Sequence, residues 1–303
     1  MTMEKTMENA TEETRRSAFM EETTEREVIH LVEERMPKIH MEMVEIEKNN
    51  GLRKRGFQIY GEDDSKRMVI YQEELIRACG ASCTAREAAD YLCRVMEQEK
   101  PVLFHKEMFC DWDKVKSNVY KKVVNYEKNA DRLPFYVHRR FLDLAELYYV
   151  RVPISRERWG NAEVSLPVLE AWGISEEELE KQATDNLEAD GYQIRPVEDF
   201  LPGMCICQSR LYLIQNRSME LGAAVMTDPG QMKTLLEKLG SSGYVFPCSI
   251  HELLILPDDG NLEVKDLRKM VQEVNQEAVT LEEFLSDQVY YCHLETGETE
   301  LCP

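Results

Sequence analysis

Three capping-box sequences constrain the fold of this chain more than any other feature, because each marks the first turn of a helix. They are Thr24-x-x-Glu27, Thr84-x-x-Glu87 and Ser175-x-x-Glu178, in which hydroxyl and carboxylate bind backbone amides that the helix leaves free. Between them lie short apolar runs separated by Gly, Pro, Asn and Asp, which is typical of strands and turns. Helices and short strands mixed in this way predict an α+β chain.

The N-terminal part is expected to contain a β-meander with helices. Residues 41–48 and 53–60 have the composition of two strands, and Asn50-Gly51 between them tolerates the positive φ of a tight hairpin. A third strand follows over Arg67–Tyr71. Further along, the apolar, tyrosine-rich stretch Phe141–Val152 is interpreted as a helix that passes into a strand.

The C-terminal part alternates strands and helices and predicts a mixed sheet with helices on one face. Its clearest helix is Val264–Ala278, in which apolar side chains recur at helical spacing. Gly222–Met226 is short and apolar, so it is interpreted as a strand.

The charge is distributed unevenly over the 303 residues and suggests where the chain divides. The formal net charge is −20, and residues 159–303 contribute 9 basic against 27 acidic groups. We therefore expect a disordered tail over 1–20, an N-terminal α+β region over 21–158 that is mildly basic from residue 51, and an acidic C-terminal α+β region over 159–303. So negative a chain disfavours nucleic acid as a partner.

Several features indicate a cytoplasmic protein that does not enter a membrane. No stretch approaches the roughly 18 consecutive apolar residues that a spanning helix needs. The start of the sequence has no apolar segment of the kind that a secretory signal requires. The cysteines number nine, an odd count that is typical of free thiols in a reducing compartment.

A zinc site is one possible use of the C-terminal cysteines and histidines. Candidate ligands occur at Cys205-x-Cys207, Cys248-x-x-His251 and Cys292-His293. Zinc sites usually take their ligands in pairs two to four residues apart on turns, and only Cys248 and His251 have that spacing. We therefore expect no metal, and no motif points to another cofactor.

The common catalytic signatures for phosphate, dinucleotide and ester chemistry do not occur in the sequence. What remains is a short set of reactive or charged side chains: the catalytic candidates His138, Ser249, His251 and Glu252, and the ligand-binding candidates Arg139, Arg140 and Asp143. The segment around His251 also fits a turn in which that histidine binds the backbone, and Arg140 with Asp143 also fits a structural ion pair.

Several segments together resemble an uncharacterised bacterial family, domain-of-unknown-function family 5688, from about residue 20 to 299. In order along the chain, these segments are 124–129, 137–144, 169–179, 247–252, 271–275 and 285–291. The chain departs from the family pattern at Cys248, where serine is usual. The resemblance implies no activity, because none is assigned to the family.

These observations favour a non-catalytic accessory protein that binds another protein through its acidic C-terminal half. One alternative is a hydrolase-like enzyme for a small anionic substrate, with His138, Arg139, Arg140 and His251 in one cleft. A second alternative is an acidic mimic of DNA. The oligomeric state is left open.

Overall fold

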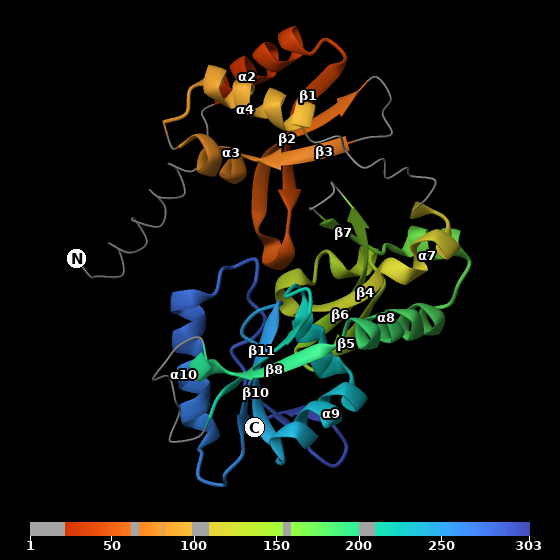
Figure 1. The fold of residues 1–303 in the computed structure, drawn as a ribbon, viewed down its shortest axis with the longest axis vertical. Helices are drawn as coiled ribbons and strands as arrows, with labels where there is room; N and C mark the ends of the chain where they lie inside the picture. The colour runs from red at the N-terminus through yellow and green to blue at the C-terminus, as the bar shows by residue number, and fades with distance from the viewer. Residues whose placement is uncertain (1–21, 62–66, 81, 99–108, 154–158, 200–209) are drawn as a thin grey trace, which may run out of the picture. The chain divides into compact units, whose positions relative to one another are not determined.

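The computed structural model describes residues 22–61, 67–80, 82–98, 109–153, 159–199 and 210–303 (Figure 1). The expected tail over 1–20 lies outside these residues. Spatial contacts between Cα atoms divide the chain into two compact units. The first unit comprises residues 1–48, 52–107 and 153–159, and the second comprises residues 49–51, 108–152 and 160–303. The expected division into an N-terminal region over 21–158 and a C-terminal region over 159–303 stays a prediction.

The first unit is a three-stranded antiparallel meander with helices packed on it, which confirms the N-terminal expectation. Its apolar interior includes Val28, Phe57 and Leu92, none of which is exposed to solvent. In chain order its elements are α2 (Glu22–Arg35), β1 (Ile39–Glu47), β2 (Arg53–Gly61), β3 (Arg67–Tyr71), α3 (Gln72–Cys79) and α4 (Ala85–Gln98).

The second unit contains two antiparallel sheets, so the α+β class is confirmed. In the smaller sheet the order is β4-β6-β5, and β7 also pairs with β6. Its strands are β4 (Val119–Asn125), β5 (His138–Phe141), β6 (Leu144–Pro153) and β7 (Trp159–Glu163). The accompanying helices are α6 (Trp112–Val115), α7 (Leu166–Trp172) and α8 (Glu176–Asp190), with 3-10 turns η1 (Asn49–Gly51), η2 (Lys116–Asn118), η3 (Glu127–Asn129) and η4 (Leu133–Phe135).

The larger sheet has six strands in the order β13-β12-β10-β11-β9-β8. They are β8 (Tyr192–Pro196), β9 (Tyr212–Asn216), β10 (Gly243–Phe246), β11 (Glu252–Pro257), β12 (Tyr290–Cys292) and β13 (Thr299–Leu301). Two long helices, α9 (Pro229–Leu239) and α10 (Val264–Ala278), accompany them, together with η5 (Val197–Asp199) and η6 (Gly222–Thr227).

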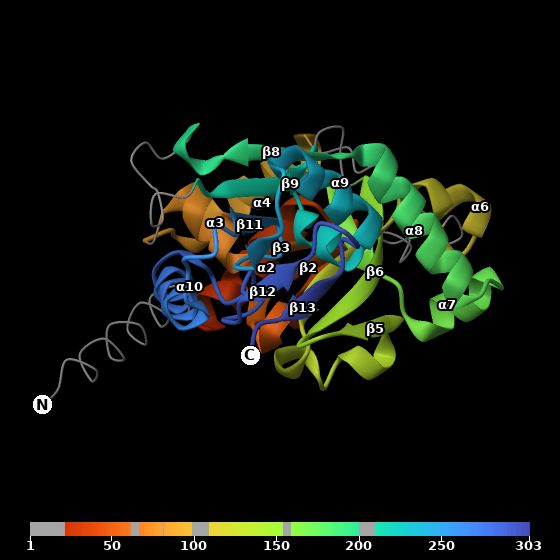
Figure 2. The same cartoon turned by 90° about the horizontal axis from the view of Figure 1, so that it is seen from below.

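The expectation of a mixed sheet with helices on one face is wrong. Every ladder of the six-stranded sheet is antiparallel. Leu236 of α9 and Val245 of β10 belong to one apolar cluster, whereas Val271 of α10 and the neighbouring Phe246 belong to another, so the two helices cover opposite faces (Figure 2). The sequence signal for this arrangement is the wholly apolar run of β10, because a strand covered on both faces does not alternate.

Two local expectations are also wrong. Gly222–Met226 belongs to the 3-10 turn η6 and not to a strand. Phe141–Val152 contains no helix: Leu142 takes a positive φ of 56° and turns the chain from β5 into β6. Tyrosines and β-branched residues in this stretch favour the strand, and pairing with β4 fixes it.

The two-sided burial of the larger sheet predicts a large effect of trimming its core. Leu236 of α9 is not exposed at all, so Leu236→Ala should lower the free energy of unfolding in urea by about 2–5 kcal/mol. Met219 is 63% exposed, and Met219→Ala serves as the control that should leave stability unchanged within about 0.5 kcal/mol. Equal effects of the two substitutions would contradict the assignment of this core.

Candidate functional site

The chain between α10 and β12 forms a loop whose backbone is held from several directions. We call residues 281–285 the 281–285 loop. Its turn is closed by Thr280, whose carbonyl accepts the amide hydrogens of Glu283 and Phe284 at 3.1 and 3.0 Å. The Thr280 hydroxyl also donates to Glu283 Oε2 at 2.8 Å. Leu281 is 42% exposed at the loop surface.

Two asparagines of η1 bind the carbonyls of this loop. The Asn49 amide donates to the carbonyl of Glu282 at 2.6 Å. The Asn50 amide donates to the carbonyls of Leu281 and Phe284, both at 2.7 Å. Asn50 has a φ of 59°, a left-handed conformation that asparagine adopts more readily than most residues. Side-chain amides therefore replace the backbone partners that a loop lacks.

Two asparagines from η3 and the end of β4 complete this arrangement. Asn125 donates from its amide to the Leu285 carbonyl at 2.8 Å. The fully buried Asn129 exchanges hydrogen bonds with Asn50: its Oδ1 accepts the Asn50 backbone amide at 3.0 Å, and its Nδ2 donates to Asn50 Oδ1 at 2.9 Å. Asn129 also donates to the Asn125 carbonyl at 2.8 Å. The four asparagines thus form one connected support for the loop.

Beyond the loop, Asp143 at the β5–β6 turn receives two hydroxyl donors. Ser286 Oγ donates to Asp143 Oδ2 at 2.7 Å, and Tyr290 donates its hydroxyl to Asp143 Oδ1. Burial and the neighbouring Asp143 carboxylate raise the pKa of Tyr290, which keeps its proton for this bond. Asn275 of α10 donates to the Ser286 carbonyl at 3.0 Å and to Asp287 Oδ1 at 2.8 Å.

The segment Cys248–Ile250 pairs with the loop through the backbone, and the side chains of Ser249 and His251 bind backbone amides beside it. The amide of Ile250 donates to the Glu283 carbonyl at 2.9 Å, and Ser249 Oγ accepts the amide of His251 at 3.0 Å. His251 Nδ1 accepts the backbone amide of Leu221 at 3.2 Å, so the histidine does bind the backbone. Its Nε2 lies 3.7 Å from Glu283 Oε1.

The remaining site candidates lie in other contacts. His138 Nδ1 is 3.0 Å from the Tyr136 carbonyl, and Glu252 pairs with Gln215 in the larger sheet. Arg140 donates to the Leu142 carbonyl at 3.1 Å, with its guanidinium 4.4 Å from the centre of the Tyr126 ring. Within the described residues, no hydrogen bond or ion pair joins His138, Arg139 or Arg140 to His251.

Arg139, whose side chain is 56% exposed, lies at the edge of an interior network of charges on the smaller sheet. Lys121 of β4 and Glu146 of β6 are only 1% and 0% exposed, and their Nζ and Oε2 atoms are 3.5 Å apart. Arg139 pairs with Glu146 across the β5–β6 ladder, with 3.1 Å between Nη2 and Oε1. Glu180 of α8 accepts from Lys121 at 3.0 Å and from Tyr148 at 2.5 Å.

The surroundings shift the pKa values of the two glutamates of this network in opposite directions. Burial raises the pKa of Glu146, although Lys121 acts in the opposite direction. Burial also disfavours the charged form of Glu180, but the Lys121 ammonium and hydrogen bonds from Glu146, Tyr148 and Lys121 lower its pKa to about 2. Two cations facing two carboxyl groups hold α8 against the sheet, since one unpaired member would be a costly buried charge.

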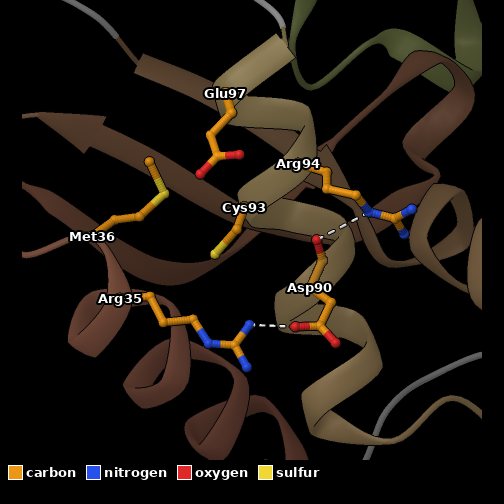
Figure 3. Close-up of a pocket in the computed structure, with 6 residues that line it drawn as sticks. All are labelled: Arg35, Met36, Asp90, Cys93, Arg94 and Glu97. Carbon is orange, nitrogen blue, oxygen red and sulfur yellow. Dashed lines mark hydrogen bonds and ion pairs between the residues drawn. The ribbon is translucent and has the colours of Figure 1, made fainter.

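A hollow of about 610 Å³ lies beside the C-terminal end of α2 and α4 in the first unit (Figure 3). Three of the charged residues that line it, Arg35, Asp90 and Arg94, bind one another. Arg35 binds Asp90 Oδ1 at 2.5 Å, and Arg94 donates to the Asp90 carbonyl at 3.3 Å. The lining residues are Arg35, Met36, Asp90, Cys93, Arg94 and Glu97.

Sequence reasoning missed the asparagine support, the hydrogen bonds of Asn275 and the interior network, and the last two leave a signal in the sequence. Lys121 and Glu146 are flanked on their own strand faces by apolar or aromatic residues two positions away, and a charge in such a place needs a partner. Asn275 lies inside a helix, where asparagine is unfavourable unless its amide is used. Cys205 and Cys207 lie outside the described residues, among which no three metal-binding side chains gather.

Removing the Asn50 amide should destabilise the protein. Asn50→Ala leaves the carbonyls of Leu281 and Phe284 without donors and places alanine at positive φ, so the free energy of unfolding should fall by about 3 kcal/mol. Asn50→Gly removes the amide without the strained φ and should cost less. An unchanged urea midpoint for Asn50→Ala would contradict this role of the amide.

The lowered pKa of Glu180 predicts a difference in acid stability. A carboxyl group whose pKa falls from 4.5 to about 2 on folding stabilises the protein above pH 4.5, and this stabilisation disappears as the pH falls through 2. The stability advantage of the wild type over Glu180→Gln should therefore shrink between pH 5 and pH 2. Glu188→Gln, at an exposed position of the same helix, should follow the wild type at every pH. A gap between wild type and Glu180→Gln that is constant with pH would exclude this linkage.

Among the helices of the described residues, none combines the length and the apolar character that a membrane crossing requires.

Comparisons with known proteins place the chain in a family. No curated protein and no solved structure matches the chain. The model of a family of unknown function, DUF5688, matches residues 17–293, which confirms the resemblance seen in the sequence. The chain belongs to this family.

Proposed function

We propose that the protein is a non-catalytic cytoplasmic module that binds another protein through the 281–285 loop. The observation that carries the proposal is the support of this loop by side-chain amides from separate segments, chiefly Asn49, Asn50 and Asn125. A loop fixed before binding loses little conformational entropy when a partner docks, and recognition segments are commonly held in this way.

The loop surface combines an apolar anchor with negative charge. Leu281 is 42% exposed, and the side chain of Glu283 is 40% exposed. Phe284 is half-buried, and Lys128 Nζ lies 5.3 Å from the centre of its ring. An apolar side chain beside acidic groups suits a partner segment in which lysine or arginine adjoins an apolar residue.

The charge of the surrounding region favours the same partner. Residues 159–303 carry 9 basic and 27 acidic groups, so a positively charged surface would be attracted to this part of the protein. Such attraction accelerates association and weakens with added salt. A cytoplasmic location agrees with the odd number of cysteines.

The contacts of the reactive side chains also support a binding role. Both oxygens of Asp143 accept hydroxyl hydrogens, and Ser249 and His251 accept backbone amides. Each of these groups thus orients the loop or the segment beside it. A catalytic role would need at least one of them to reach a substrate instead.

The test is a binding measurement with defined peptides on the full chain. An array of random 12-residue peptides, half enriched in Lys and Leu and half in Glu and Leu, is probed with the labelled wild type, and positive peptides are then measured in solution. The proposal predicts binding to the Lys and Leu set, with an affinity that falls as salt increases. Leu281→Ser should weaken this binding about tenfold, because it removes the apolar anchor.

A matched control is available in β13, where Leu301 is 36% exposed. Leu301→Ser should bind as the wild type does, and unfolding curves confirm that both variants are folded. Equal binding by Leu281→Ser and the wild type, or peptides selected from the acidic set alone, would overturn the proposal.

A further inference from the structure

The smaller sheet has an open edge at β5. The extended chain begins just before this strand, where the Val137 amide donates to the Val164 carbonyl at 2.9 Å. His138–Phe141 then pair with β6. Because β5 stands at the end of the order β4-β6-β5, no strand of the described residues pairs with its outer side (Figure 2).

The backbone groups that face this open side belong to His138 and Arg140. Val137 bonds toward Val164, and Phe141 faces β6 because it closes the two-residue turn between β5 and β6. Backbone groups alternate in direction along an extended chain, so His138 and Arg140 turn their amides and carbonyls outward. These are the groups with which an added strand pairs.

The side chains along this edge are basic and apolar. Arg139 is 56% exposed, and Arg140 is exposed on the other face of the strand. Phe135, which is 68% exposed, comes shortly before β5. Leu166, which is 45% exposed, lies opposite Phe135, one position beyond the isolated antiparallel bridge in this region. The edge therefore presents an apolar pair followed by two arginines.

The charge around this edge differs in sign from that of the whole chain. Residues 112–141 carry 8 basic and 3 acidic groups, whereas the formal net charge of the chain is −20. Among the described residues, Arg140 pairs with no carboxylate, since its guanidinium binds the Leu142 carbonyl and lies over the Tyr126 ring. Charges more than about 8 Å apart are largely screened at physiological ionic strength, so the nearby arginines dominate the attraction of a ligand.

We propose that the open edge of β5 binds an extended acidic segment of a partner protein as an additional strand. The backbone of the segment bonds to His138 and Arg140, which is the usual source of affinity in strand addition. Two adjacent carboxylates bind Arg140 and Arg139, and an apolar side chain covers Phe135 and Leu166. An antiparallel segment therefore has two acidic residues, three spacer residues and an apolar residue, in that order.

This surface uses residues other than those of the 281–285 loop, and it selects a ligand of the opposite charge. The two surfaces can therefore be tested independently of each other. Leu281→Ser, which should weaken binding at the loop, should leave binding at the β5 edge unchanged.

The experiment measures fluorescence anisotropy of the labelled peptide Gly-Glu-Glu-Thr-Val-Thr-Leu-Gly with the full chain at graded salt. The peptide should bind, its affinity should fall as salt increases, and the version with Lys-Lys in place of Glu-Glu should not bind. Methylation of the backbone nitrogen of the first Thr, which lies opposite His138, should weaken binding about tenfold or more. The same methylation at Val, which faces away from the edge, is the matched control and should have little effect.

Substitutions in the protein test the side-chain contacts. Phe135→Ser and Arg140→Gln should each weaken binding about tenfold, because they remove the apolar contact and the unpaired charge. Leu281→Ser is the control that should bind as the wild type does. All three variants are compared at matched unfolding midpoints, so that a loss of binding reports the surface and not the fold.

Three results would overturn the proposal. The first is equal binding of the acidic and basic peptides, and the second is equal binding of the peptides methylated at Thr and at Val. The third is a dimer of the free chain, seen by sedimentation, that Arg140→Gln dissociates, because this would assign the edge to a second copy of the chain. Wild-type affinity in both Phe135→Ser and Arg140→Gln would also contradict the assigned contacts.

Discussion

Hydrogen bonds from asparagine amides to loop carbonyls are the constraint on which the rest of the second unit depends. The 281–285 loop belongs to no sheet of its own, so its carbonyls need partners from elsewhere. Asn50 supplies two of them from a residue with left-handed backbone, and Asn129 fixes Asn50 in turn. Burying these amides is favourable because their N–H groups are bonded to loop carbonyls, and these bonds give the loop a single position.

The interior charge network also uses buried polar side chains to fix a segment, in this case the helix α8 on the smaller sheet. Lys121 and Glu146 lie where an apolar pair would pack at less cost, since buried ions must recover a large desolvation energy. Glu180 and Arg139 complete the pairing and define how α8 sits on the smaller sheet. In the charge network, some stability is given up for a defined geometry of α8 on the sheet.

Local signals predicted much of the fold, and the errors arose where distant pairing decides. The capping hydrogen bonds of Thr84 and Ser175 are formed, and Val264–Ala278 is the helix that its apolar spacing indicates. The helix expected at the start of Phe141–Val152 is wrong because pairing with β4 and β5, which lie elsewhere in the sequence, decides the structure of this stretch. Gly222–Met226 is apolar because η6 is buried beneath the sheet, and burial alone does not distinguish a strand from a turn.

The candidate site was predicted only in part, for a physical reason. Asp143, Ser249 and His251 attract notice because their side chains can carry out chemistry, and all three lie around the loop. The asparagines do not attract notice, because an amide that binds a backbone carbonyl more than 150 residues away leaves no spacing pattern. Sequence patterns report local periodicity, whereas this support is made of contacts between distant segments.

The central claim, that the 281–285 loop is rigid before any partner binds, is tested most directly by ¹⁵N relaxation of the free protein. Loops without such support commonly give order parameters below about 0.6, whereas rigid backbone gives about 0.85. The account predicts that the amides of residues 281–285 match those of β10 and β11 near the upper value. Values near the lower one, in a protein whose strands remain ordered, would contradict it.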